Sequence, residues 1–87
     1  MTSQKTIKMD FQKIYDNHEF NVNIYRMYYT QIVHNIELQG RSAFSYMWAY
    51  ADSIKAENYE RAKAITDVLK PLGYNTADTH YLLPNLN

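Results

Sequence analysis

The chain has 87 residues, a size that allows one domain with a single modest core. Nine Lys and Arg side chains balance nine Asp and Glu side chains, and this zero net charge argues against duplex DNA as a partner, because phosphate binding normally needs a basic excess. The absence of cysteine excludes disulfides and thiolate sites and fits a reducing compartment.

No stretch of the sequence approaches the roughly 18 apolar residues of a membrane span, and the polar start lacks the apolar run of a signal peptide. We therefore expect a protein of the cytoplasm with no membrane partner. Neutrality near pH 7 leaves little charge repulsion between copies, which favours self-association.

A short helix is predicted near the start of the chain. Asp10 could cap it, and it would run through Tyr15. The turn-forming residues Asp16, Asn17 and His18 follow directly and interrupt it.

Two long helices are predicted next from the apolar period and from the few glycines and prolines. The first is expected at residues 19–38 and ends at Gly40, which suits a left-handed cap. The second is expected at residues 42–70, because Pro71 disfavours helix at the preceding residue and Gly73 follows. No alternating pattern typical of a strand competes with these helices.

The connection between the long helices, at residues 39–41, is too short for any arrangement other than an antiparallel pair. The predicted fold class is therefore all-α: a long antiparallel helical hairpin with a short N-terminal helix, forming one domain over residues 1–87. Residues 75–87 have no helical period, and the apolar stretch at residues 81–83 is expected to fold back onto the helices.

One continuous apolar stripe follows the second long helix. It consists of Phe44, Met47, Trp48, Ala51, Ile54, Ala62, Ile65, Leu69 and Leu72. The opposite, polar side consists of Ser53, Glu57, Glu60, Lys63 and Asp67. Asn58 falls inside the stripe, where a polar residue most often makes a local hydrogen bond; the alternative is a contact across a subunit interface.

The first long helix is apolar on most sides. Its broad arc consists of Val22, Tyr25, Tyr28, Tyr29, Ile32, Val33 and Ile36, with further apolar positions at Phe20, Ile24, Met27 and Leu38. One hairpin partner cannot cover so much surface, so we expect a homo-oligomer in which Tyr28 and Trp48 pack the hairpin and its neighbours.

The sequence offers no pattern typical of catalysis. His18, His34 and His80 lack the helical spacing of metal ligands, and two glycines cannot form a phosphate-binding loop. No nucleophile motif is present, and no carboxylate lies in an apolar context that would tune it for acid–base chemistry. We expect no catalytic residue, no metal and no cofactor, and hence a protein that is not an enzyme.

The remaining chemistry combines aromatic rings with single cations. Rings can stack on a nucleobase, and an isolated Arg or Lys can hold a phosphate. The candidate ligand-binding residues are Phe11, Tyr15, Tyr25, Arg26 and Tyr29. The alternative is that these rings fill the core or an interface and that the cations are solvated.

The segment at residues 40–49 resembles a family of small helical-hairpin bacteriophage proteins that counter CBASS immunity by sequestering cyclic nucleotide signals, related to the Thoeris anti-defence hairpin domain. Members typically carry an Arg at the start of the second helix and a Met-Trp-Ala step within it. The corresponding residues are Arg41 and Met47-Trp48-Ala49.

The resemblance implies a homohexamer of the host bacterial cytoplasm that binds cyclic dinucleotides such as 3′,3′-cGAMP, and by extension cyclic trinucleotides, without cleaving them. It implies a phosphate-binding cation at Arg26 and a base-stacking ring at Phe11 or Tyr15, a choice that the sequence leaves open. Two other functions are compatible with the sequence: a helical interaction module that inhibits or regulates a host protein through a tyrosine-rich face, and a structural assembly protein without a ligand.

Overall fold

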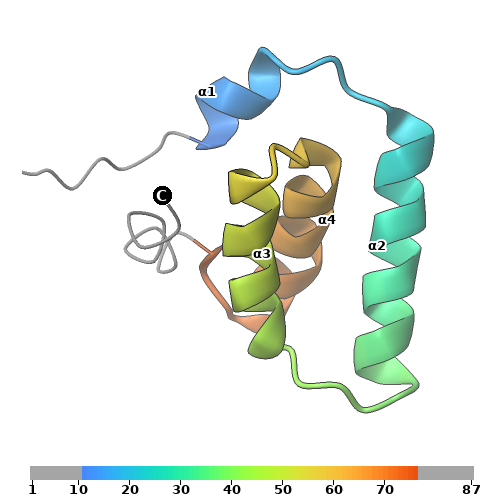
Figure 1. Cartoon of the computed structure of the whole chain (residues 1–87). Helices are drawn as coiled ribbons and strands as arrows, with labels where there is room; N and C mark the ends of the chain where they lie inside the picture. Colours follow the sequence, from blue (N-terminus) through green and yellow to red (C-terminus); the bar gives the residue numbers. More distant parts are fainter. Residues whose placement is uncertain (1–10, 77–87) are drawn as a thin grey trace, which may run out of the picture.

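The computed structural model describes residues 11–76, with the side chains of residues 11 and 12 left aside, and this part of the chain is helical without strands (Figure 1). Its elements are α1 (Phe11–Asp16), α2 (Val22–Glu37), α3 (Ser45–Lys55), α4 (Tyr59–Leu69) and the 3-10 helix η1 (Lys70–Leu72). The all-α class and the short N-terminal helix are confirmed. The predicted cap at Asp10 and the predicted return of residues 81–83 lie outside the described residues.

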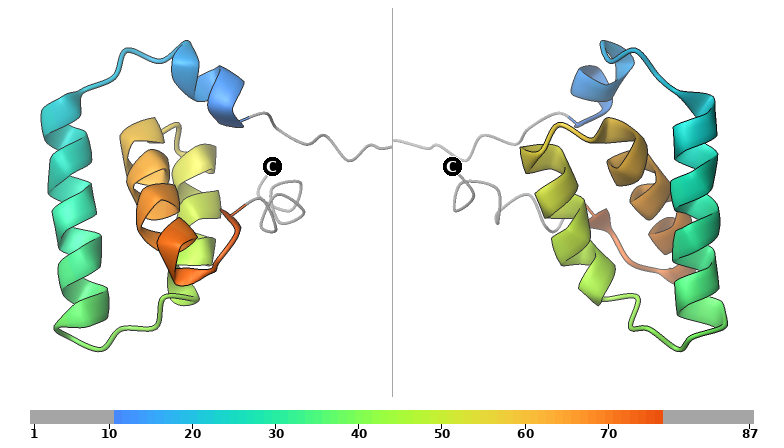
Figure 2. Two further views of the ribbon diagram at one scale, coloured as in Figure 1. Left: turned by 180° about the vertical axis from the view of Figure 1, so that it is seen from behind. Right: turned by 45° about the vertical axis from the view of Figure 1, so that its right-hand side comes forward.

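Helix α4 lies at the centre of the fold. It packs against α2 on one side and α3 on the other, and both turned views show the same order (Figure 2). Helices α3 and α4 run antiparallel, whereas α2 and α4 run in the same direction (Figure 1). The predicted long hairpin is therefore wrong: the main partner of α2 is α4, and the hairpin in this structure is the short α3–α4 pair.

The predicted helix at residues 42–70 is also wrong, because it is broken at residues 56–58. Glu57 adopts a left-handed φ of 58° and ends α3. The Glu57 N–H donates to the Ile54 carbonyl at 3.0 Å, and the Asn58 N–H donates to the Ser53 carbonyl at 2.8 Å. This pair of bonds is a Schellman motif with Glu57 in the position that glycine usually takes. Asn58 then caps α4, since its side chain accepts from the Arg61 N–H at 3.3 Å.

Helix α2 is shorter than predicted at both ends. It begins at Val22 because the Asn21 side chain accepts from the N–H groups of Asn23 and Ile24, at 3.1 and 3.2 Å. It ends at Glu37, so the connection to α3 covers residues 38–44 rather than 39–41. Gly40 has the predicted left-handed φ, 67°, but lies within this connection.

The predicted stop at the end of the second helix is confirmed. Helix α4 gives way to η1, with Pro71 inside that single turn, and Gly73 closes it with a φ of 89°. The Tyr74 N–H donates to the Leu69 carbonyl at 3.1 Å and returns the chain toward α4.

The core lies between α4 and its two neighbours. Its buried apolar residues are Ile32, Tyr50, Ala51, Ile54, Ala62, Ala64, Ile65, Val68 and Leu69. The break at residues 56–58 lets α4 fold back beside α3 (Figure 1). The predicted stripe is buried on both sides of the break, from Ala51 to Leu69, but is exposed at its two ends.

Several side chains are exposed where we predicted burial, or buried where we predicted exposure. Phe44, Trp48 and Leu72 are more than half exposed in the single chain, so Trp48 does not pack the core. Ser53 and Glu60, which were placed on the polar side, are buried. Ser53 satisfies its hydroxyl by donating to the Ala49 carbonyl at 2.7 Å.

Candidate ligand-binding site

An open hollow of about 440 Å³ lies between α2 and α4. Its lining residues are Tyr25, Arg26, Tyr29 and Thr30 of α2 and Asp67 of α4. The four α2 residues form two pairs, each one helical turn apart, which places their side chains on adjoining strips of the helix surface. The hollow therefore combines aromatic rings, a hydroxyl, a cation and a carboxylate within a volume typical of small-molecule sites, roughly 300–1,000 Å³.

The contact between Tyr25 and Asp67 fixes one wall of the hollow. The Tyr25 hydroxyl donates to Asp67 Oδ2 at 2.5 Å. Burial, followed by this hydrogen bond and the charge of the carboxylate, raises the pKa of Tyr25, so its hydroxyl stays a donor. Lys63 Nζ contacts both oxygens of Asp67, at 3.0 and 3.2 Å, and balances its charge one turn away on α4.

Tyr25 and Tyr29 belong to a row of four neighbouring rings, which we call the aromatic row: Tyr15, Phe20, Tyr25 and Tyr29. Successive ring centroids are 5.2, 5.4 and 6.0 Å apart, in edge-to-face or tilted arrangements. Lys63 Nζ lies 5.9 Å from the centroid of Tyr15. Tilted contacts hold rings together by their edges. The row thus connects α1 and the following linker to the hollow on α2.

Arg26 is the cation that the hollow offers to an anion. Its side chain is exposed and forms no salt bridge with any residue from 13 to 76. The other cations nearby on α4 are engaged: Lys63 contacts Asp67, and Arg61 lies 3.6 Å from Asp52. An exposed, unpaired guanidinium at the edge of a hollow is suited to a charge-assisted, bidentate contact with phosphate.

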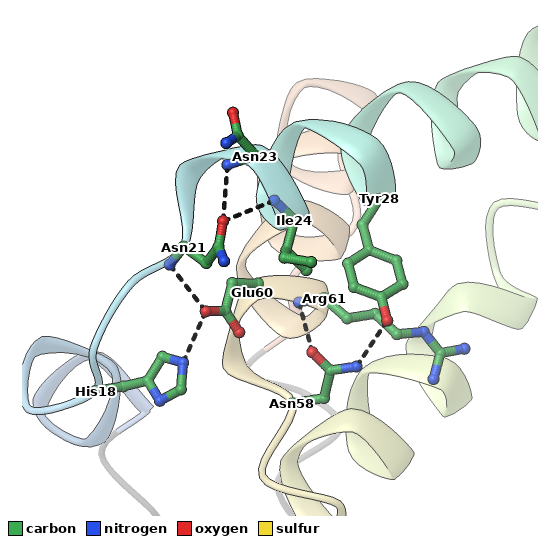
Figure 3. A network of polar contacts seen from close by, with 8 residues as sticks. All are labelled: His18, Asn21, Asn23, Ile24, Tyr28, Asn58, Glu60 and Arg61. Carbon is green, nitrogen blue, oxygen red and sulfur yellow. Dashed lines mark hydrogen bonds and ion pairs between the residues drawn. The ribbon is translucent and has the colours of Figure 1, made fainter.

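A polar network holds the chain between α1 and α2 against the start of α4 (Figure 3). The buried Glu60 carboxylate accepts from the Asn21 N–H at 3.0 Å and contacts His18 Nε2 at 2.8 Å. Burial alone would raise the pKa of Glu60, but the hydrogen bonds from Asn21 and His18 outweigh it and lower the pKa. The His18 ring also packs edge-to-face on Tyr59 at 5.1 Å. This network fixes the segment that carries Tyr15 and Phe20.

Asn58 provides a second link between α2 and α4 (Figure 3). Besides capping α4, its Nδ2 group donates to the Tyr28 hydroxyl at 3.0 Å. Both contacts lie within one chain, so the prediction of a local hydrogen-bonding role for Asn58 is confirmed.

The structure brings together three of the five residues predicted to bind a ligand. Tyr25, Arg26 and Tyr29 all line the hollow. Tyr15 lies in the aromatic row but is not one of the lining residues. The side chain of Phe11 lies outside the described residues.

Sequence reasoning missed the contribution of α4 and of the linker. Asp67 and Lys63 had been placed on a solvated helix face, and Phe20 had been treated as interface surface. Asp67 is 42 positions from Tyr25, and no local spacing rule relates residues that far apart. The one available signal was the spacing of Lys63 and Asp67. It predicts an ion pair on one helix face but does not predict that Tyr25 of α2 lies beside it.

The chain matches no protein-family model, no curated protein sequence and no solved structure. Within the described residues, no helix is both long and apolar enough to cross a membrane. Among the same residues, no group of three His, Asp or Glu side chains could hold a metal ion. A proposal of function therefore rests on the residues and geometry of the hollow together with the resemblance at residues 40–49.

Proposed function

We propose that this protein binds cyclic oligonucleotides without cleaving them, and so keeps CBASS effectors of an infected bacterium from being activated. The ligands are cyclic dinucleotides such as 3′,3′-cGAMP and, by extension, cyclic trinucleotides. The observation that carries the proposal is the meeting of Tyr25, Tyr29 and Arg26 at one hollow. The proposal requires action in the host bacterial cytoplasm, where such signals are made.

The chemistry of these three side chains matches a nucleotide. A tyrosine ring can stack on any base, and each stacked base contributes about 1–3 kcal/mol. The free guanidinium of Arg26 supplies the phosphate contact, which explains how a chain of zero net charge can bind an anionic ligand. A single local cation is sufficient because a cyclic dinucleotide has few phosphates.

We also propose that the protein acts as a homo-oligomer, with the hexamer that the family resemblance implies. Large apolar side chains remain exposed along α2 and next to it, notably Phe20, Val22, Ile24, Met27 and Leu38. Exposed apolar surface of this kind is typical of subunit contacts. A second copy packed near α2 would also cover the open side of the hollow, which a single chain leaves to solvent.

A thermal-shift series with 3′,3′-cGAMP tests the proposed function. The wild-type protein should melt at a higher temperature with the ligand, whereas Arg26→Ala should lose most of this shift and keep the same assembly. Arg41→Ala is the matched control, because Arg41 is also exposed but lies beyond the other end of α2. A wild-type protein that is indifferent to every cyclic nucleotide would refute the proposal, and normal binding by Arg26→Ala would refute the assignment of the site.

A second candidate function is supported by two exposed rings at the start of α3. Phe44 and Trp48 lie one turn apart and are each 56% exposed, an arrangement also suited to docking on a host protein. Light scattering separates the two candidates. A mass near that of six 10.3 kDa chains favours the nucleotide binder, whereas a monomer or dimer that captures a specific host protein favours the interaction module.

A further inference from the structure

Asp67 lines the hollow, but neither stacking of a base nor contact with a phosphate explains a carboxylate there. It is the only contribution of α4 among the residues that line the hollow, and its side chain is 29% exposed. A carboxylate is an acceptor and repels phosphate, so its presence in an anion-binding site has a cost. Lys63 offsets this cost by balancing the charge, which leaves Asp67 free to contact a donor group of the ligand.

The geometry around Asp67 holds its carboxylate firmly and leaves room for further bonds. Tyr25 fixes Oδ2 from one side, at 2.5 Å. A carboxylate has about four lone-pair positions, and Tyr25 and Lys63 together use three of them. Lys63 and Asp67 lie one turn apart on one helix, and their side chains are 31% and 29% exposed. Such partly exposed pairs are weak, so the ammonium can yield a position to a ligand.

Guanine is the base whose donors match such a carboxylate. Its Watson–Crick edge presents N1–H and the 2-amino group side by side, so two donors can meet the two oxygens of one carboxylate. Adenine presents the N1 lone pair at the same edge and would meet Asp67 with an acceptor. A site built to accept hydrogen bonds discriminates strongly against a ligand that leaves its acceptors unpaired.

We infer that Asp67 accepts hydrogen bonds from a guanine stacked at Tyr25 and Tyr29, so that the site selects guanine-containing cyclic nucleotides over those that contain only adenine. This inference rests on the proposed function. Tyr25 is then a positioning residue as well as a stacking ring, since its hydroxyl orients the carboxylate. Arg26 binds the phosphate next to the same base.

Titration of the wild-type protein with cyclic di-GMP, 3′,3′-cGAMP and cyclic di-AMP tests the selectivity. Affinity should fall in that order, with at least a tenfold difference between the first and the last. Equal affinity or a preference for cyclic di-AMP would overturn this inference and leave the proposed function intact. Binding of none of the three, nor of any cyclic trinucleotide, would overturn both.

The role of Asp67 itself is tested by Asp67→Asn, which replaces two acceptor oxygens by one acceptor and one donor. This variant should bind cyclic di-GMP and cyclic di-AMP within about threefold of each other, because the two-oxygen contact is lost. Asp52→Asn is the matched control, since Asp52 is an exposed carboxylate on α3, and it should keep the wild-type preference. Retention of the preference by Asp67→Asn would contradict the inference.

A ligand-side experiment keeps the test independent of any folding defect in Asp67→Asn. Cyclic di-IMP carries hypoxanthine, which has N1–H but lacks the 2-amino group of guanine. The wild-type protein should bind it about tenfold more weakly than cyclic di-GMP, the effect of one lost hydrogen bond to a charged acceptor. Indistinguishable affinities would overturn the proposed contact.

Discussion

Replacement of Glu60 by glutamine tests how the segment before α2 is held in place. The Glu60 carboxylate accepts from Asn21 N–H and His18 at 3.0 and 2.8 Å, and its side chain is only 10% exposed. Glutamine preserves the shape but makes these bonds neutral, which costs about 1.5 kcal/mol for the two together. Loss of the negative charge in the first turn of α4 adds about 0.5 kcal/mol. We expect Glu60→Gln to lower the free energy of unfolding by about 2 kcal/mol, or the melting temperature by roughly 8–16 °C.

The pH dependence provides an internal check on this assignment. Because the pKa of Glu60 is lowered in the folded chain, its stabilising contribution is complete above the ordinary glutamate value of 4.5 and is lost as pH falls through the folded-state pKa. Urea unfolding followed by circular dichroism at pH 7 and at a series of lower pH values should therefore show a smaller acid-induced loss in Glu60→Gln than in wild type. Glu37→Gln, an exposed carboxylate on α2, is the matched control and should change stability by less than about 0.5 kcal/mol. Equal stability of Glu60→Gln and wild type at pH 7, with parallel pH profiles, would refute the role of the network.

Three further substitutions test the α3–α4 break and the proposed stacking of a base on Tyr29. Glu57→Gly should raise the free energy of unfolding by about 0.5–1 kcal/mol in urea titrations, because glycine relieves the left-handed conformation at φ 58° by more than it adds to unfolded-chain entropy; a loss of stability would contradict this. Asn58→Ala should destabilise the protein by about 2 kcal/mol in the same assay, since it removes both the cap of α4 and the bond to Tyr28, whereas a loss below 0.5 kcal/mol would show that neither contact matters. Tyr29→Ala should weaken cyclic dinucleotide binding by roughly 1–3 kcal/mol in calorimetric titrations while Tyr29→Phe binds like wild type; equal losses in both would argue against stacking.

The local parts of the fold follow from local chemistry, and these are the parts that the sequence predicts. Gly73 closes the last helical turn, and the core residues Ile54 and Ile65 lie on predicted apolar faces. The break between α3 and α4 could not be predicted, because no glycine or proline marks it. Glu57 takes a conformation that is uncommon for a side chain with a Cβ, and the capping role of Asn58 was hidden by its place inside an apolar stripe.

In the candidate site, too, contacts within one helix could be predicted from the sequence and contacts between helices could not. Tyr25, Arg26 and Tyr29 share one helix, so their period predicts that they lie close together. The carboxylate of Asp67 reaches them only because α4 packs beside α2, and that pairing depends on the break that was missed. In one continuous helix, the residues of α4 would extend beyond the end of α3 instead of folding back beside it.

The measurement that tests the central proposal most directly is the concentration of free 3′,3′-cGAMP in the presence of the protein. Excess purified protein is mixed with the ligand, the protein-bound fraction is removed by filtration, and the free and heat-released nucleotide are quantified by chromatography. The proposal predicts that free ligand is strongly depleted and that heating returns it as the intact cyclic molecule. Unchanged free ligand would contradict binding, and a linear product after heating would contradict sequestration without cleavage.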